Sequence, residues 1–294
     1  MKWIRYSVAF FWLLNLNLLA QMPQTSLWYL KISEVDQNSW TVQKLKYLSN
    51  FNQNSYNNQP YFINDHAFLA TVSLKTKPDP DIYHFDLKNE TYTILLDHKL
   101  SDYSARIHPL YKDELTTVQV SMNPDTMQKL VSYDILSGVQ KKVILAKHGK
   151  IGYYRFLSPE KWVCFIVDEF HLLAICDEKL NERQIFASNI GRCFEVLENG
   201  KILFVQKTKD LPNKLKLYDP KTKQMEILTE LPAGVEDFAL TENGSIICGQ
   251  GSKLFSYQSD SKSWKNLLDL NAYGITNMKR IAFNNKQLII VNEQ

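Results

Sequence analysis

A unit of strand, turn and strand recurs along this chain, and it constrains the fold more than any other feature. In the copy at 214–228 (KLKLYDPKTKQMEIL), two apolar-rich runs flank Asp219-Pro220-Lys221-Thr222, whose residues favour a turn. Each copy carries one polar residue just before its turn, which we call the turn anchor: Asp86, Asp134, Asp177, Asp219 and Gln258. Successive anchors are 48, 43, 42 and 39 residues apart, and such a period of strand patterns is typical of propeller blades.

Two further strand patterns precede each anchor. Before Asp219 they are 192–198 and 201–208, joined at Asn199-Gly200, and before Gln258 a second Asn-Gly pair joins 236–242 to 245–250. Asn-Gly between apolar runs is a strong hairpin signal. Each period therefore predicts four antiparallel strands, which make one blade. An aspartate at the anchor is expected to accept hydrogen bonds from the backbone amides of its turn.

The two ends of the chain complete one further blade. The patterns at 278–284 and 287–293 supply only the first two strands of a blade, and those at 27–33 and 39–49 supply only the last two. Sharing a blade between the termini closes the ring and removes exposed sheet edges. We therefore predict an all-β, six-bladed β-propeller of four-stranded antiparallel blades, forming a single domain over 21–294.

The first 20 residues have the layout of a secretory signal peptide. Lys2 and Arg5 form the charged start, Tyr6–Leu14 the apolar run, and a cleavage site precedes Gln21. An uncleaved anchor is the alternative, although the apolar run is short for it. We predict removal of 1–20 and a periplasmic or secreted mature protein with no integral membrane segment.

Composition adds two expectations. The formal net charge of +3, without a long Lys/Arg run, gives no indication of a nucleic-acid partner. The four cysteines all lie inside apolar strand patterns, which favours free buried thiols. A disulfide between Cys164 and Cys176, which flank one predicted hairpin, is the alternative.

The stretch Tyr56–His66 (YNNQPYFINDH) resembles the repeat of TolB-type propellers, the WD-like periplasmic repeat. Gln59-Pro60-Tyr61-Phe62 and Asn64-Asp65 match that pattern, and Ser158-Pro159-Glu160-Lys161 is a second, weaker match. The resemblance implies a six-bladed, exported propeller that binds other envelope proteins.

In a propeller the innermost strands line a central channel, where ligands and partners commonly bind. Aligning the repeats places six residues at equivalent positions around this channel: Gln59, Arg106, Arg155, Cys193, Asp237 and Arg280. Three arginines against one aspartate leave a positive ring, which Glu195 and Glu236, close by in sequence, would partly neutralise. The ring is either a set of mutually paired polar residues or a site for an anion or carboxylate, because guanidinium binds carboxylates bidentately.

We predict a non-catalytic protein that binds an envelope or secreted protein or peptide at the channel mouth and needs no cofactor. The predicted contact residues are Gln59, Arg106, Arg155, Asp237 and Arg280. The alternative is a metal-dependent propeller hydrolase or lactonase with a channel-bound cation such as calcium. Against it, the ring holds one carboxylate, and His108 is the only histidine on a predicted inner strand. A third possibility is a pure spacer.

Overall fold

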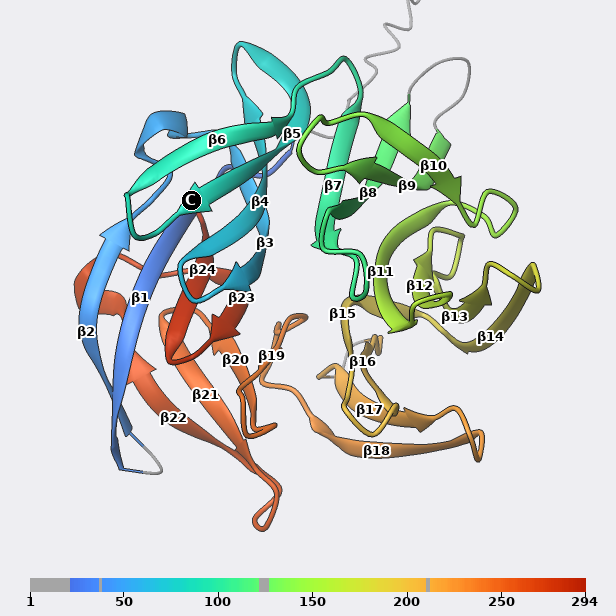
Figure 1. Ribbon diagram of the computed structural model, residues 1–294. Coiled ribbons are helices and arrows are strands. Elements are labelled where there is room, and N and C mark those ends of the chain that lie inside the picture. Colours follow the sequence, from blue (N-terminus) through green and yellow to red (C-terminus); the bar gives the residue numbers. More distant parts are fainter. Residues whose placement is uncertain (1–21, 37–38, 122–126, 210–211) are drawn as a thin grey trace, which may run out of the picture.

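The chain forms a ring of six antiparallel sheets, each of four strands (Figure 1). The computed structural model describes residues 22–36, 39–121, 127–209 and 212–294, so the expected signal peptide at 1–20 lies outside the described residues. Two 3₁₀ helices, η1 (Asn50–Asn52) and η2 (Asn271–Tyr273), are short. No helix among the described residues is both long and apolar enough to cross a membrane. The predicted six-bladed all-β propeller is confirmed.

Each blade has an innermost, a second, a third and an outermost strand. From blade one to blade six, the innermost strands are β3 (Tyr56–Asn64), β7 (Ser101–Ile107), β11 (Ile151–Ser158), β15 (Ile190–Val196), β19 (Ala239–Leu240) and β23 (Met278–Asn284). In the same order, the second strands are β4 (Ala67–Leu74), β8 (Glu114–Ser121), β12 (Lys161–Ile166), β16 (Ile202–Gln206), β20 (Ile246–Gln250) and β24 (Gln287–Glu293). The third strands are β5 (Lys77–Asp86), β9 (Met127–Asp134), β13 (Leu172–Asp177), β17 (Lys214–Asp219), β21 (Lys253–Gln258) and β1 (Thr25–Asp36). The outermost strands are β6 (Thr91–Leu96), β10 (Gln140–Ile144), β14 (Glu182–Ser188), β18 (Gln224–Glu230), β22 (Ser263–Asp269) and β2 (Ser39–Tyr47).

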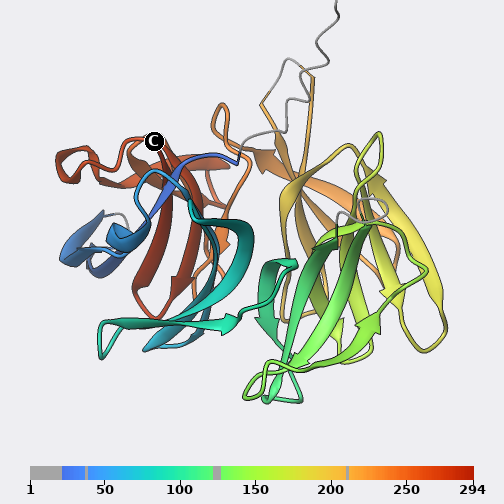
Figure 2. The same ribbon diagram turned by 90° about the horizontal axis from the view of Figure 1, so that it is seen from above.

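The sixth blade joins the two ends of the chain, as predicted. β1 pairs antiparallel with β24 from Thr25 opposite Glu293 to Lys31 opposite Gln287. Figure 2 shows the blue amino-terminal strands and the red carboxyl-terminal strands side by side. The ring is thereby closed by hydrogen bonds between segments that are distant in sequence.

The hydrophobic core lies between the blades. Six clusters of buried side chains occur among the described residues, one at each boundary between neighbouring blades. In the cluster between blades two and three, Leu130 of β9 packs with Tyr154 of β11 and Trp162 of β12. Each sheet is thus covered on both faces, which explains why the second strands β4, β12 and β24 are mostly apolar and why β8, which has several polar residues, is mostly buried as well.

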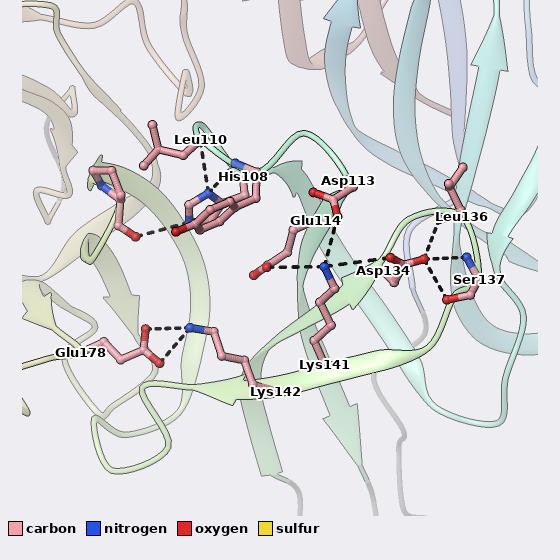
Figure 3. Close-up of polar contacts among 12 residues, drawn as sticks. His108, Leu110, Asp113, Glu114, Asp134, Leu136, Ser137, Lys141, Lys142 and Glu178 are labelled. Carbon is pink, nitrogen blue, oxygen red and sulfur yellow. Dashed lines mark hydrogen bonds and ion pairs between the residues drawn. The ribbon is translucent and has the colours of Figure 1, made fainter.

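The aspartate anchors set the hairpin turns, as predicted. In Figure 3, Asp134 Oδ1 accepts hydrogen bonds from the backbone amides of Leu136 (3.2 Å) and Ser137 (2.9 Å). The anchors of blades one, three and four accept equivalent backbone bonds. Gln258, the anchor of blade five, makes none of these bonds among the described residues; its amide instead donates to Ser256 Oγ at 3.4 Å.

The hydrogen bonds of the aspartate anchors predict that the fold becomes less stable at acid pH. Backbone amides of the turns hold the pKa of each aspartate anchor below its usual 3.8. A carboxyl whose pKa is lower in the folded than in the unfolded state stabilises above about pH 4, and this contribution is lost as the pH falls through the folded-state pKa. Replacing all four with asparagine keeps the acceptor oxygen and removes the charge. We expect the variant's urea midpoint to change less between pH 5 and pH 2.5 than that of the wild type. Asp260→Asn, in the corresponding turn of blade five, is the control, and equal acid slopes in all three proteins would contradict the prediction.

Blade five departs from the predicted pattern. We expected an innermost strand over 236–242, but β19 covers only Ala239–Leu240. The backbone N–H of Phe238 donates to Cys193 Sγ at 3.4 Å, and the Phe238 carbonyl accepts a hydrogen bond from the same thiol. The backbone of Phe238 therefore bonds to blade four instead of pairing with the neighbouring strand of blade five.

The four cysteines are free and buried, as expected from their strand positions. Burial raises the pKa of the Cys193 thiol well above its ordinary value, and the Cys164 thiol is affected in the same way. These thiols pack as small apolar side chains.

Candidate functional site

The innermost strands surround a central cavity of about 270 Å³. Its lining includes all five residues that the sequence predicted to meet around the channel: Gln59, Arg106, Arg155, Asp237 and Arg280. The repeat alignment therefore identified side chains that the fold brings together. Their order along the channel differs from the prediction.

Strand pairing separates the lining into two levels. The position two residues before each turn anchor can be followed across the sheet: His84 lies opposite Leu69, which lies opposite Tyr61. Following the same strand pairing in each of the other blades gives one residue of its innermost strand. Blade six has no turn anchor, so its position is counted from the hairpin between β23 and β24. These six residues form the trailing tier: Tyr61, Arg106, Arg155, Glu195, Ala239 and Ala282. Two residues earlier on each strand lies the leading tier: Gln59, Ser104, Tyr153, Cys193, Asp237 and Arg280.

The predicted ring thus mixed the two tiers. It took Arg106 and Arg155 from the trailing tier and the other residues from the leading tier. An error of two residues keeps a strand side chain on the same face, and every member of the predicted ring belongs to the cavity lining. The prediction missed Tyr61, Ser104 and Tyr153, whose positions follow only from the strand register.

Arg155 is held by a carboxylate of the next blade. Its Nε donates to Glu195 Oε2 at 2.8 Å, and its Nη2 donates to Oε1 at 2.6 Å, a bidentate pair. Burial alone would raise the pKa of Glu195, but the Arg155 guanidinium outweighs burial and lowers it. Both side chains are mostly buried, so this pair joins blades three and four at the channel wall. Glu236, the other acid expected to neutralise the ring, contacts Lys207 instead at 2.9 Å.

Arg280 is held in a similar way. Its Nε donates to Asp237 Oδ2 at 3.2 Å, while the backbone N–H of Ile281 donates to Asp237 Oδ1 at 3.1 Å. Burial would lower the pKa of Arg280, but Tyr153 and Asp237 outweigh it and raise that pKa. The pair joins blades five and six. For these two arginines, the interpretation as mutually paired wall residues describes the geometry.

Tyr153 lies in the leading tier, with the Arg280 guanidinium 5.4 Å from its ring centre. Burial would raise the pKa of its phenol, but Arg280 and the exposed Arg192 outweigh burial and lower it. Gln59 Nε2 lies 3.5 Å from the same hydroxyl. These two cations therefore favour the phenolate form of Tyr153.

Arg106 differs from the other two arginines of the predicted ring. Its guanidinium lies 4.7 Å from the ring centre of Tyr61, and no carboxylate among the described residues forms an ion pair with it. Burial and the neighbouring Arg155 lower its pKa, which still leaves an arginine charged at neutral pH. Arg106 is thus a half-buried cation of the cavity lining that forms no ion pair among the described residues, and the charge of Glu195 acts on it only from beyond ion-pair distance.

Small side chains lie on the blades opposite those of Arg106 and Arg155. With six blades in a ring, blade two lies opposite blade five and blade three opposite blade six (Figure 1). In the trailing tier, Ala239 therefore lies on the blade opposite that of Arg106, and Ala282 lies on the blade opposite that of Arg155. Small side chains at these positions are compatible with the open space of about 270 Å³ that Arg106 lines.

Gln59 is committed to the wall. Its Oε1 accepts from the hydroxyl of Thr71 at 2.8 Å and from the backbone N–H of Ser104 at 2.7 Å. Its own backbone has φ +55°, in the left-handed region. Gln59 therefore joins blades one and two and presents only part of its amide to the cavity.

His108 was the one histidine expected near the channel. It follows the end of β7, where Nδ1 accepts from the backbone amides of Leu110 and Tyr111, both at 3.2 Å (Figure 3). Its Nε2 lies 3.3 Å from the carbonyl oxygen of Pro159. It is a buried, fully bonded turn residue. No cluster of three or more His, Cys, Asp or Glu side chains suited to a metal ion occurs among the described residues.

No family model and no curated protein matches the sequence. Solved structures do match in fold. TolB from Acinetobacter baumannii has 15% identity and a TM-score of 0.61, with 83% of this chain and 63% of that chain covered. This chain thus spans less than two thirds of that protein.

Two further structures share the fold. A putative TolB from Agrobacterium tumefaciens has 9% identity and a TM-score of 0.65, covering 92% of this chain and 99% of the other. An oligogalacturonate lyase in complex with manganese has 11% identity and a TM-score of 0.55, covering 87% and 82%. At these identities the likeness concerns architecture. The chain has a TolB-like six-bladed β-propeller fold.

Proposed function

We propose that this protein is an exported, non-catalytic binder that receives an anionic group of a protein or peptide partner in its central channel. The observation that supports this most is Arg106. Two arginines of the channel wall are neutralised by Glu195 and Asp237, whereas Arg106 has no acidic partner among the described residues. An unpaired charge in a cavity costs stability, and an anionic ligand would offset that cost.

The partner class follows from the cavity's size and position. A space of about 270 Å³ admits a side chain or the end of an extended segment, not a folded element. A neighbouring pocket of about 520 Å³ shares Arg192, Asp237 and Arg280 with the channel and widens the approach. A peptide segment inserted from this side would first pass Arg192, Asp237 and Arg280. The signal-peptide pattern at 1–20 is the basis for proposing export.

Partner capture with single-residue variants tests the proposal. Arg106→Gln should weaken binding of a captured partner by about 10- to 100-fold, because a charge-assisted hydrogen bond contributes about 1.5–3 kcal/mol. Lys75→Gln, which removes one positive charge from the exposed turn between β4 and β5, is the matched control and should bind normally. The readout is retention of envelope proteins by immobilised 21–294, followed by titration of the retained partner.

Equal retention by the wild type and Arg106→Gln would overturn the assignment of the channel as the binding site. The rival function is a metal-dependent hydrolase or lactonase with a channel cation. The oligogalacturonate lyase in complex with manganese, which shares the fold, is an enzyme and motivates this rival. A rise in melting temperature with calcium and a fall with EDTA would favour that rival, because a ligand that binds the folded state stabilises it.

A further inference from the structure

Ser104, two residues before Arg106 on β7, has an unused hydroxyl at the cavity. The residue is only 8% exposed and belongs to the cavity lining. Its Oγ has no hydrogen-bond partner among the described residues. A buried hydroxyl without a partner is costly, and buried polar groups are normally bonded. Ser104 therefore keeps one buried donor beside the cavity for which the described residues provide no acceptor.

The backbone at Ser104 is strained. Its φ of +55° lies in the left-handed region, which costs a residue with a Cβ about 1–3 kcal/mol. The strand register shifts once across this point, between Tyr103 and Arg106, which marks a β-bulge. β3 carries a matching bulge at Gln59, also at φ +55°, and the two are joined by the Ser104 N–H···Gln59 bond. Bulges re-aim side chains locally.

We propose that Ser104 and Arg106 together form a carboxylate subsite, an inference that rests on the proposed function and specifies its ligand. Arg106 lies over the Tyr61 ring, which supports one face of the guanidinium. The N–H groups at the edge of a guanidinium match the two oxygens of a planar carboxylate. The Ser104 hydroxyl supplies one further donor to a group that accepts up to about four hydrogen bonds. Glu195 and Asp237 are the two carboxylates of the cavity lining that could pair with Arg106. They form ion pairs with Arg155 and Arg280 instead.

A carboxylate can come from the carboxyl terminus of a partner or from an Asp or Glu side chain. Three probes separate these sources: acetyl-Ala-Ala with a free acid, its amide, and acetyl-Ala-Asp amide. Each is titrated into wild-type 21–294 and the affinity is measured by calorimetry or NMR. A free-acid preference assigns the chain terminus, and a preference for the Asp probe assigns the side chain. Equal affinity of all three probes would overturn the carboxylate assignment.

The residue assignment is tested with Ser104→Gly and Ser104→Ala. Glycine accepts the positive φ, so Ser104→Gly relieves strain while it removes the hydroxyl. Both variants should bind the preferred acid about 10- to 100-fold more weakly, the effect of one hydrogen bond to a charged group. Ser101→Ala, on the same strand but outside the cavity lining, is the control and should bind like the wild type.

The outcomes distinguish this inference from the proposed function. If both Ser104 variants bind the acid as the wild type does while Arg106→Gln does not, the Ser104 subsite is wrong and channel binding stands. If partner capture is unaffected by Arg106→Gln, the proposed function itself fails, whatever the probes show. Unfolding by urea confirms that each variant is folded, and Ser104→Gly should be at least as stable as the wild type.

Discussion

A chain that ends at Lys286, and so lacks β24, is expected to lose its cooperative fold. β24 is the second strand of the shared blade and pairs with β1 and β23. Its four central side chains are fully buried: Leu288, Ile289, Ile290 and Val291. They enter both neighbouring core clusters, Leu288 and Ile290 on the side of blade five and Ile289 and Val291 on the side of blade one.

The size of the effect follows from burial. At about 1.5–3 kcal/mol for each fully buried aliphatic side chain, the four account for about 6–12 kcal/mol, a large part of the roughly 5–15 kcal/mol by which folded proteins are stable. Loss of β24 also leaves the buried backbone groups of β1 unpaired. Closure of the ring therefore depends on this strand.

Urea unfolding followed by circular dichroism measures the effect. The matched control ends at Asn292, which removes Glu293 and Gln294 but leaves all four core side chains in place. We expect the control to unfold near the wild-type midpoint and the shorter chain to show no cooperative transition. A cooperative transition of the shorter chain at the wild-type midpoint would show that the other five blades are stable without closure.

The blade architecture could be predicted because short sequence patterns determine where each strand and hairpin begins and ends. Anchors such as Asp219 and pairs such as Asn199-Gly200 mark hairpins through turn chemistry that acts over a few residues. The shared blade followed from counting strands at each end. The failure at β19 arose because Phe238 bonds Cys193 of another blade, a contact that no local pattern reveals.

The channel residues were identified, but their levels were not. Loops between second and third strands differ in length: β16 ends at Gln206 and β17 begins at Lys214, whereas β20 ends at Gln250 and β21 begins at Lys253. Surface loops accept such insertions without changing the strand register. Counting residues from an anchor therefore does not show whether a channel residue belongs to the leading or the trailing tier. The ion pairs depend on that level. Arg155 meets Glu195 of the next blade, while Arg106 meets no carboxylate among the described residues, and only the register distinguishes the two arginines.

Breaking the ion pair between Arg155 and Glu195 is expected to destabilise the fold strongly. Arg155→Met should lower the free energy of unfolding by about 3 kcal/mol, because removal of one partner leaves the other charge buried without compensation. Glu195→Gln should also destabilise, since it leaves the Arg155 charge unpaired. The double variant should be more stable than the sum of the two single changes predicts, which measures the coupling in a double-mutant cycle. Arg106→Met is the matched control: with no ion pair to break, it should leave stability unchanged or increase it.

The pH dependence identifies the charge responsible. Because Arg155 holds the pKa of Glu195 below its ordinary 4.5, the pair stabilises the fold above that pH, and its contribution is lost as the pH falls through the lower folded-state value. In Arg155→Met the unpaired Glu195 is relieved by protonation, so the deficit relative to the wild type should shrink from pH 7 to pH 3.5. Urea midpoints across this range test the prediction. If Arg106→Met were as destabilising as Arg155→Met, Arg106 would be a structural wall residue like the others, and the main support for ligand binding in the channel would be lost.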